Sequence, residues 1–122
     1  LTVDGNILAS GTVTGSSDRN RKETFKSVDP QEILDKVVSM EIQRWNYIGE
    51  ETPHLGPVAQ DFHNAFEVGM DDKHISMVDA DGVALAAIQG LNHKLEQEND
   101  ELRQRVARLE RLLQARWGGA LQ

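Results

Sequence analysis

The chain has 122 residues, a net charge of −7, no cysteine, and aromatic side chains at only 5% of its positions. This length allows one small domain with appendages, and the lack of cysteine excludes disulfides and thiolate metal sites. An acidic chain is not expected to bind nucleic acid, because phosphate contacts need clustered Lys and Arg. No apolar run approaches the about 20 residues of a membrane span. So few large side chains predict a thin core, so we expect support from partner chains.

Residues 1–16 alternate short β-branched runs with turn dipeptides, of which Asp4-Gly5 is the strongest. The pattern predicts strands too short to bury a face alone. We interpret the segment as the end of an upstream β-rich fibre whose strands are completed by neighbouring chains. A disordered Gly/Ser-rich terminus is the alternative.

A helix is predicted to begin where Asp29 precedes Pro30, with Asp29 as the N-cap and Pro30 at the first helical position. Its apolar face recurs at helical spacing through Ile33, Leu34 and Val37. This helix opens the structured part of a compact zone that we assign to residues 17–78.

The rest of the compact zone mixes short strands and helices. Residues 42–48 predict a strand with Trp45 and Tyr47 on one face. The further expectations are a loop over 49–56, a helix over 58–66, a turn over 69–73 and a short extended segment over 75–78. The predicted fold class is therefore α+β.

Residues 79–116 predict one long helix, capped by Asp79 or Asp81 and ended by the pair Gly118-Gly119. Apolar residues recur every seven positions, with a second series three residues earlier in each heptad. This a/d seam predicts a parallel coiled coil over residues 79–117. The seam residues are Leu85, Ile88, Asn92, Leu95, Asn99, Leu102, Val106, Leu109 and Leu113.

Charges beside the seam agree with a parallel arrangement. Glu98 is placed to face Arg103 of a neighbouring helix, and Arg105 to face Glu110. The two Asn residues in the seam cost stability but fix the register. The seam alone does not choose between two and three strands.

Ser17 and Lys22 are the candidate chemical pair. A Ser/Lys dyad needs a neutral amine to take the hydroxyl proton, whereas a free lysine amine, with a pKa of about 10.4, is charged at pH 7. Neighbouring cations such as Arg19, Arg21 and Lys26 favour the neutral form. By pattern alone, a solvated basic turn is the alternative, and Asp18 either orients Lys22 or caps that turn.

No metal or other cofactor is predicted. The four histidines share no metal-ligand spacing, and Asp79-Ala-Asp81-Gly82 lacks the later residues of a calcium loop. We expect His54 to align the segment that follows it. The histidines are His54, His63, His74 and His93.

Four stretches together resemble the endosialidase-type intramolecular chaperones, the S74 peptidases. They are Ser17-Asp-Arg-Asn-Arg-Lys-Glu-Thr-Phe25, Trp45-Asn46-Tyr47, His54-Leu-Gly-Pro-Val-Ala-Gln60-Asp-Phe62, and Val78-Asp-Ala-Asp-Gly-Val-Ala84 before the heptads. They occur in the family's order, and this version is most similar to those of bacterial fibre-type proteins and their prophages.

The resemblance implies a homotrimer that cuts its own Ser16–Ser17 bond, with Ser17 as nucleophile and Lys22 as base. It also implies that residues 1–16 belong to an upstream fibre or tailspike and that the rest is a removable chaperone. The expected location is a phage or prophage virion fibre or the bacterial cell surface, with the chaperone released after assembly.

The predicted function is therefore a C-terminal intramolecular chaperone that trimerises, folds the upstream fibre and releases itself by autoproteolysis. A permanent trimerisation cap without cleavage is one alternative. A zipper-type adaptor that binds a partner helix is another.

Overall fold

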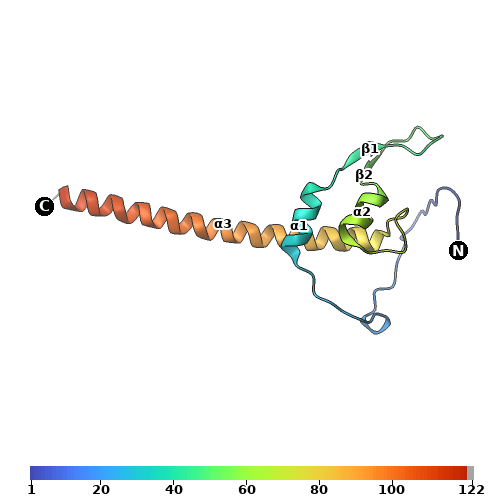
Figure 1. Ribbon diagram of the computed structural model, residues 1–122, viewed down its shortest axis with the longest axis horizontal. Coiled ribbons are helices and arrows are strands. Elements are labelled where there is room, and N and C mark those ends of the chain that lie inside the picture. Colours follow the sequence, from blue (N-terminus) through green and yellow to red (C-terminus); the bar gives the residue numbers. More distant parts are fainter. Residues whose placement is uncertain (121–122) are drawn as a thin grey trace.

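Helix α3 (Met77–Ala120) is 44 residues long and forms a rod that projects from the rest of the chain (Figure 1). The computed structural model describes residues 1–120, and their side chains as far as Gly118. The head contains helices α1 (Pro30–Ser39) and α2 (Ala59–Phe66) and an antiparallel pair of strands, β1 (Gln43–Trp45) and β2 (His54–Gly56). The predicted small mixed domain with a long C-terminal helix is confirmed, whereas the surrounding fibre and the trimeric coiled coil remain predictions.

Helix α1 begins as the sequence predicts. Asp29 is extended, and its Oδ1 accepts a hydrogen bond from the backbone N–H of Gln31 at 3.0 Å. Pro30 occupies the first turn, where its missing N–H costs nothing. Glu32 and Lys36, one turn apart, form an exposed ion pair at 3.3 Å.

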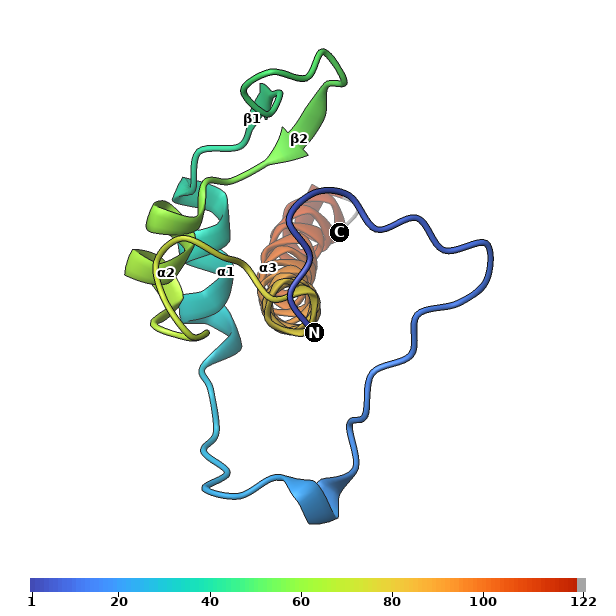
Figure 2. The same cartoon turned by 90° about the vertical axis from the view of Figure 1, so that its right-hand side faces the viewer.

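Helix α1 crosses α3 at Gly90. A Cβ atom on Gly90 would lie 2.3 Å from the carbonyl oxygen of Pro30 and 3.1 Å from Cβ of Leu34. Both views place the two helices side by side (Figures 1 and 2). Leu34 and Ala87, each 7% exposed, are buried in the described head. The glycine thus permits a contact that any larger residue would block.

The β1–β2 hairpin pairs Arg44 with Leu55 and Trp45 with His54. The predicted strand is shorter than expected, and the predicted loop over 49–56 is wrong at its end, where β2 forms. The turn between them closes when the N–H of Glu50 donates to the carbonyl of Tyr47 at 3.0 Å. Gly49 supplies the positive φ of 87°.

Helix α2 confirms the predicted second short helix, with Val58 at its N-cap position. Phe62 is 5% exposed and lies 4.9 Å from the ring of Phe66, measured between centroids. The helix ends at Glu67, which adopts the left-handed conformation. Its apolar side therefore adds to the thin core.

Both predicted ends of α3 are wrong. The helix begins at Met77, because the carbonyl of Ser76 accepts from the N–H groups of Asp79 and Ala80 at 3.1 and 3.0 Å. Asp79 therefore lies in the first turn and is not the cap, and residues 77–78 are not extended. At the other end the helix continues through Gly118. Glycine costs about 1 kcal/mol relative to alanine, but extending an existing helix is easier than starting one.

The predicted strands of residues 1–16 are absent. This segment is irregular and exposed throughout, and it leads away from the head as an open arm (Figure 2). A strand needs a neighbour for its backbone groups, and the described part of the chain offers none here. None of the described helices is long and apolar enough to cross a membrane.

Candidate functional site

Ser17 and Lys22 lie in contact. The Lys22 amine donates to Ser17 Oγ, with 2.6 Å between Nζ and Oγ. The two residues flank a single turn of 3-10 helix, η1 (Arg19–Arg21). The five-residue spacing of the sequence thus becomes a direct side-chain contact.

The side chain of Asp18 caps this turn. Its Oδ1 accepts from the backbone N–H of Asn20 at 3.0 Å and from Asn20 Nδ2 at 3.2 Å. Within the turn, the N–H of Arg21 donates to the Asp18 carbonyl, and the N–H of Lys22 donates to the Arg19 carbonyl. Of the two roles left open for Asp18, the structure has the cap.

A second local contact follows Lys22. Thr24 adopts a positive φ of 57°, and beyond it the ring of Phe25 lies 5.4 Å from the guanidinium carbon of Arg19. This distance is within the range of a cation–π contact. The chain around Lys22 is therefore held from both sides by short-range interactions.

None of the residues that the structure describes shields this pair from water. Every residue from 1 to 29 is exposed, and η1 contains no buried residue. Residues 1–29 form one exposed arm, and the part of this arm that carries η1 stands apart from the head (Figure 2). A general-base amine must be neutral, and water favours its charged form. The contact between the Lys22 amine and the Ser17 hydroxyl is therefore present without the dehydration that a general-base amine requires.

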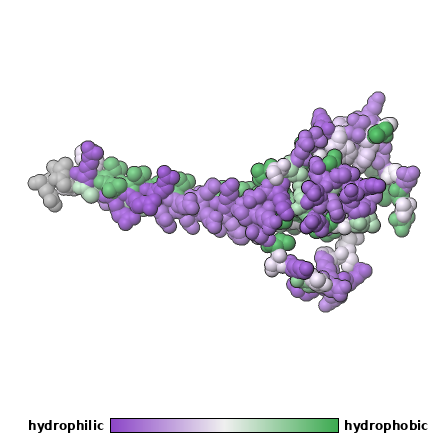
Figure 3. All heavy atoms as spheres, viewed as in Figure 1, coloured by the Kyte–Doolittle hydropathy of each residue, from purple (hydrophilic) through white to green (hydrophobic). Residues whose placement is uncertain are grey.

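The predicted seam lies open along α3. Its aliphatic residues are between about half and two thirds exposed, from Leu95 at 49% to Leu85 at 65%. In Figure 3, apolar side chains follow the upper edge of the rod near its far end, beside a hydrophilic surface. Of the two seam asparagines, Asn92 donates to Glu96 Oε1 at 3.3 Å within its own helix.

The seam and the head occupy opposite faces of α3. Gly90 faces Pro30 and Leu34 of α1, and Ala87, three positions before it on the same side of the helix, is buried. Each follows a seam residue, Leu85 or Ile88, by two positions. Two positions rotate by roughly 200° around a helix. Packing of α1 therefore leaves the seam free over its whole length.

Three further apolar residues flank the seam and escaped the sequence reasoning. They occupy the positions next to a and d in the heptad, where charged residues are more usual, and each is exposed. Assigning every heptad position, instead of a and d alone, would have found them. They are Leu91, Leu112 and Trp117.

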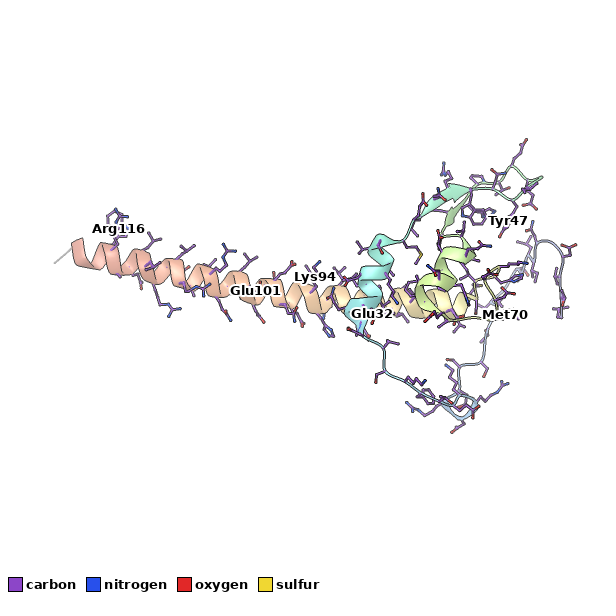
Figure 4. All side chains as sticks on the ribbon, in the orientation of Figure 1. Glu32, Tyr47, Met70, Lys94, Glu101 and Arg116 are labelled. Carbon is purple, nitrogen blue, oxygen red and sulfur yellow. The ribbon has the colours of Figure 1, made fainter. Side chains whose placement is uncertain are left out.

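Charged side chains cover the rest of the rod. Lys94, Glu101 and Arg116 lie along its length beyond the head (Figure 4). Arg103 approaches Asp100 of its own helix at 3.7 Å, with both side chains largely exposed. Such exposed ion pairs contribute little to stability in water. The charged side chains therefore form the solvated surface of the rod beside the apolar seam.

The histidines have separate surroundings. His54 stacks near Trp45 and Tyr47 at 5.1 and 5.4 Å between ring centroids. His74 contacts Asp71 at 3.0 Å. Hydrogen bonds from the backbone of Lys73 and from His74 lower the pKa of Asp71 below 3.8. No three acidic or histidine side chains gather into a metal site within the described residues.

His54 and Trp45 form the last pair of the hairpin ladder, next to the connecting loop. Trp45 Nε1 donates to the carbonyl of Gly56 at 3.2 Å, and its ring meets Tyr47 edge-on at 5.0 Å. Tyr47 projects on the hairpin, away from the rod (Figure 4). An open groove of about 670 Å³ lies between these rings and the start of α2.

The described residues form a small head with a long helical stalk and a solvent-exposed contact between Ser17 and Lys22. Residues 17–70 match the Peptidase_S74 family model, described as chaperone of endosialidase, and this segment therefore belongs to that family. The match begins at Ser17. No curated protein matches the chain.

Proposed function

We propose that this chain is a C-terminal intramolecular chaperone that trimerises, folds an upstream fibre segment and then cuts itself free between Ser16 and Ser17. The observation that carries the proposal is the 2.6 Å contact between Lys22 Nζ and Ser17 Oγ, located where the family match begins. The corresponding division is fibre for 1–16, chaperone head for 17–78 and coiled coil for 79–117.

Assembly is the first step. Other copies of the chain would remove the exposed apolar seam of α3 from water. The resemblance described above implies that three chains assemble in parallel. Glu98 then faces Arg103 of the next helix, and Arg105 faces Glu110. Linking three fibre segments at one end makes their later pairing intramolecular, which raises their effective concentration.

The cut needs no cofactor. Ser17 Oγ attacks the carbonyl carbon of Ser16 while neutral Lys22 takes the hydroxyl proton. The C–N bond breaks, the Ser17 nitrogen leaves as an amine with that proton, and an ester joins Ser16 to Ser17 Oγ. One water then hydrolyses the ester to the Ser16 carboxylate and restores the Ser17 hydroxyl.

Assembly and cleavage are coupled through water. In the single chain both members of the dyad are exposed. Closure of neighbouring chains around the arm would exclude water and favour the neutral amine. Cleavage after assembly would leave the fibre kinetically trapped, because the detached chaperone cannot reverse its folding. The setting we propose is a phage or prophage virion fibre, or a bacterial surface fibre.

Intact mass of the full chain over time tests this proposal. We expect one cut, with Ser17 at the new terminus. Ser17→Ala, Lys22→Ala and Lys22→Arg should stay whole, the last because a guanidinium does not lose its proton. Ser16→Ala should still be cut, since that side chain lies on the other side of the bond.

Two results would redirect the proposal. A new terminus anywhere except Ser17 would remove the assignment of the nucleophile. No product at about pH 8–9, where a modestly perturbed lysine becomes neutral, would favour a permanent trimerisation cap. A need for a different protein before the chain folds would favour a zipper-type adaptor.

A further inference from the structure

Asp18 fixes the turn that separates Ser17 from Lys22. We infer that Asp18 is a positioning residue for the dyad, which acts through the backbone and not on the reacting atoms. The inference rests on the proposed self-cleavage for its kinetic consequence, but its structural content stands on the hydrogen bonds of the turn.

The path from Ser17 to Lys22 is short and must fold back on itself. The Asp18 carboxylate holds the N–H of Asn20 at 3.0 Å and the Asn20 side chain at 3.2 Å. With Asn20 held, the N–H groups of Arg21 and Lys22 close onto the carbonyls of Asp18 and Arg19 at 3.0 and 3.1 Å. This closure returns the Lys22 side chain to Ser17.

No tertiary packing from the described residues supports the turn. All residues from 1 to 29 are exposed, so no buried side chain anchors η1. Forming one isolated helical turn is unfavourable, because several dihedral angles are fixed for few hydrogen bonds. A side-chain cap is therefore a large part of what holds this turn. Loss of a cap typically reduces the folded population of such an element roughly 2- to 30-fold.

The geometry indicates a cap and not a charge partner. The Asp18 oxygen that forms the turn contacts Asn20, and no ion pair joins Asp18 to Lys22 among the described residues. Asparagine is as good an N-cap as aspartate. Asp18→Asn should therefore preserve the turn, whereas Asp18→Ala should loosen it.

The chain contains a matched control. Asp29 caps α1 in the same way, with its Oδ1 3.0 Å from the N–H two residues on. That cap serves a helix packed on α3, and it lies outside the dyad turn, seven residues after Lys22. Asp29→Ala should lower the thermal stability of the head and leave the dyad turn intact.

The experiment follows Ser16–Ser17 cleavage, oligomeric state and thermal unfolding in the full chain and these three variants. We expect Asp18→Ala to slow cleavage roughly 2- to 30-fold with assembly and melting unchanged. Asp18→Asn should stay within about twofold of the natural chain. Asp29→Ala should lower the melting temperature and leave the cleavage rate unchanged. Unchanged cleavage in Asp18→Ala, or equal loss in Asp18→Asn, would overturn the positioning role.

A second readout separates this inference from the self-cleavage. The backbone amide resonances of Asn20 and Lys22 report the turn directly, whether or not the bond is cut. They should move in Asp18→Ala and stay in place in Asp18→Asn. If the natural chain is never cut, the proposed cleavage fails, and these resonances alone decide the turn. Identical resonances in Asp18→Ala would refute the cap.

Discussion

The two faces of helix α3 are satisfied in different ways. One face carries the small residues Ala87 and Gly90 and is closed by α1 of the same chain. The opposite face carries large aliphatic residues, among them Leu102 at 54% exposure, which the described residues leave uncovered. Small residues let a helix of the same chain approach closely, whereas an exposed heptad seam suits other copies. The head thus covers one side of the helix and leaves the other side exposed.

The largest effect should come from a charge in the open face. Leu102→Asp would place unpaired carboxylates together at one seam layer, and burying them costs several kcal/mol. We expect loss of assembly by sedimentation equilibrium. Ala107→Asp adds the same charge outside the seam and should leave assembly intact. A Leu102→Asp chain that assembles normally would mean that the seam is not the contact.

The closed face should respond to a single methyl group. Gly90→Ala would force Pro30 and its backbone away from α3, and overpacking of this kind typically costs about 1–3 kcal/mol. Gly82, in the same helix, has open space at its Cβ position. Gly82→Ala should therefore gain up to about 1 kcal/mol. Thermal unfolding should move in opposite directions for the two variants, and a parallel shift would contradict the close crossing.

Charges beside the seam should matter less. Glu98→Arg would set like charges against Arg103 of the neighbouring helix, at a cost of roughly 0.2–1 kcal/mol for each pair. The double variant with Arg103→Glu should recover most of this loss. The difference in melting temperature should shrink at high salt, because exposed charges are screened. A double variant no better than the single one would argue against a parallel arrangement.

The smallest effect should come from Asp71, in the exposed turn before α3. Its pKa is lowered in the folded chain by hydrogen bonds from the backbone of Lys73 and from His74. Its contribution to stability is therefore fully present above pH 3.8 and is lost as the pH falls through the lower, folded-state pKa. Asp71→Ala should lower the melting temperature by less than about 2 °C at neutral pH. That difference should vanish in acid.

Local signals in the sequence predicted the elements that local chemistry controls. Asp29 and Pro30 predict the start of α1, and the spacing of apolar residues from Val58 to Phe66 predicts α2. Strand β2 was missed because His-Leu-Gly has little strand character, and its pairing depends on Trp45 across the hairpin. The strands expected in residues 1–16 stay a prediction, because they were expected to pair with neighbouring chains and this segment is irregular in the single chain.

Gly90 shows what periodicity cannot supply. In the heptad pattern a glycine at this position only weakens the helix. The crossing of α1 explains it, because a larger residue would clash with the backbone of Pro30. Gly118 was predicted to end the helix, but the helix continues through it.

The resemblance predicts Ser17 and Lys22 as a pair. For Asp18, however, the sequence is compatible with two roles, capping the turn or orienting Lys22. Choosing between them required the hydrogen bonds of the turn, because one carboxylate can cap a backbone or orient an amine with equal plausibility in sequence. The sequence likewise does not predict that both Ser17 and Lys22 are exposed, because exposure depends on where their segment lies relative to the head.

The central claim is that assembly through the open face of α3 switches on the cut at Ser17. The most direct test dilutes the denatured, uncut chain into buffer over a series of concentrations and measures oligomeric state and cleaved fraction in the same samples. We predict that cleavage rises together with the trimer and that monomeric samples stay whole. Equal cleavage in monomeric and assembled samples, or assembled samples that are never cut, would contradict the account.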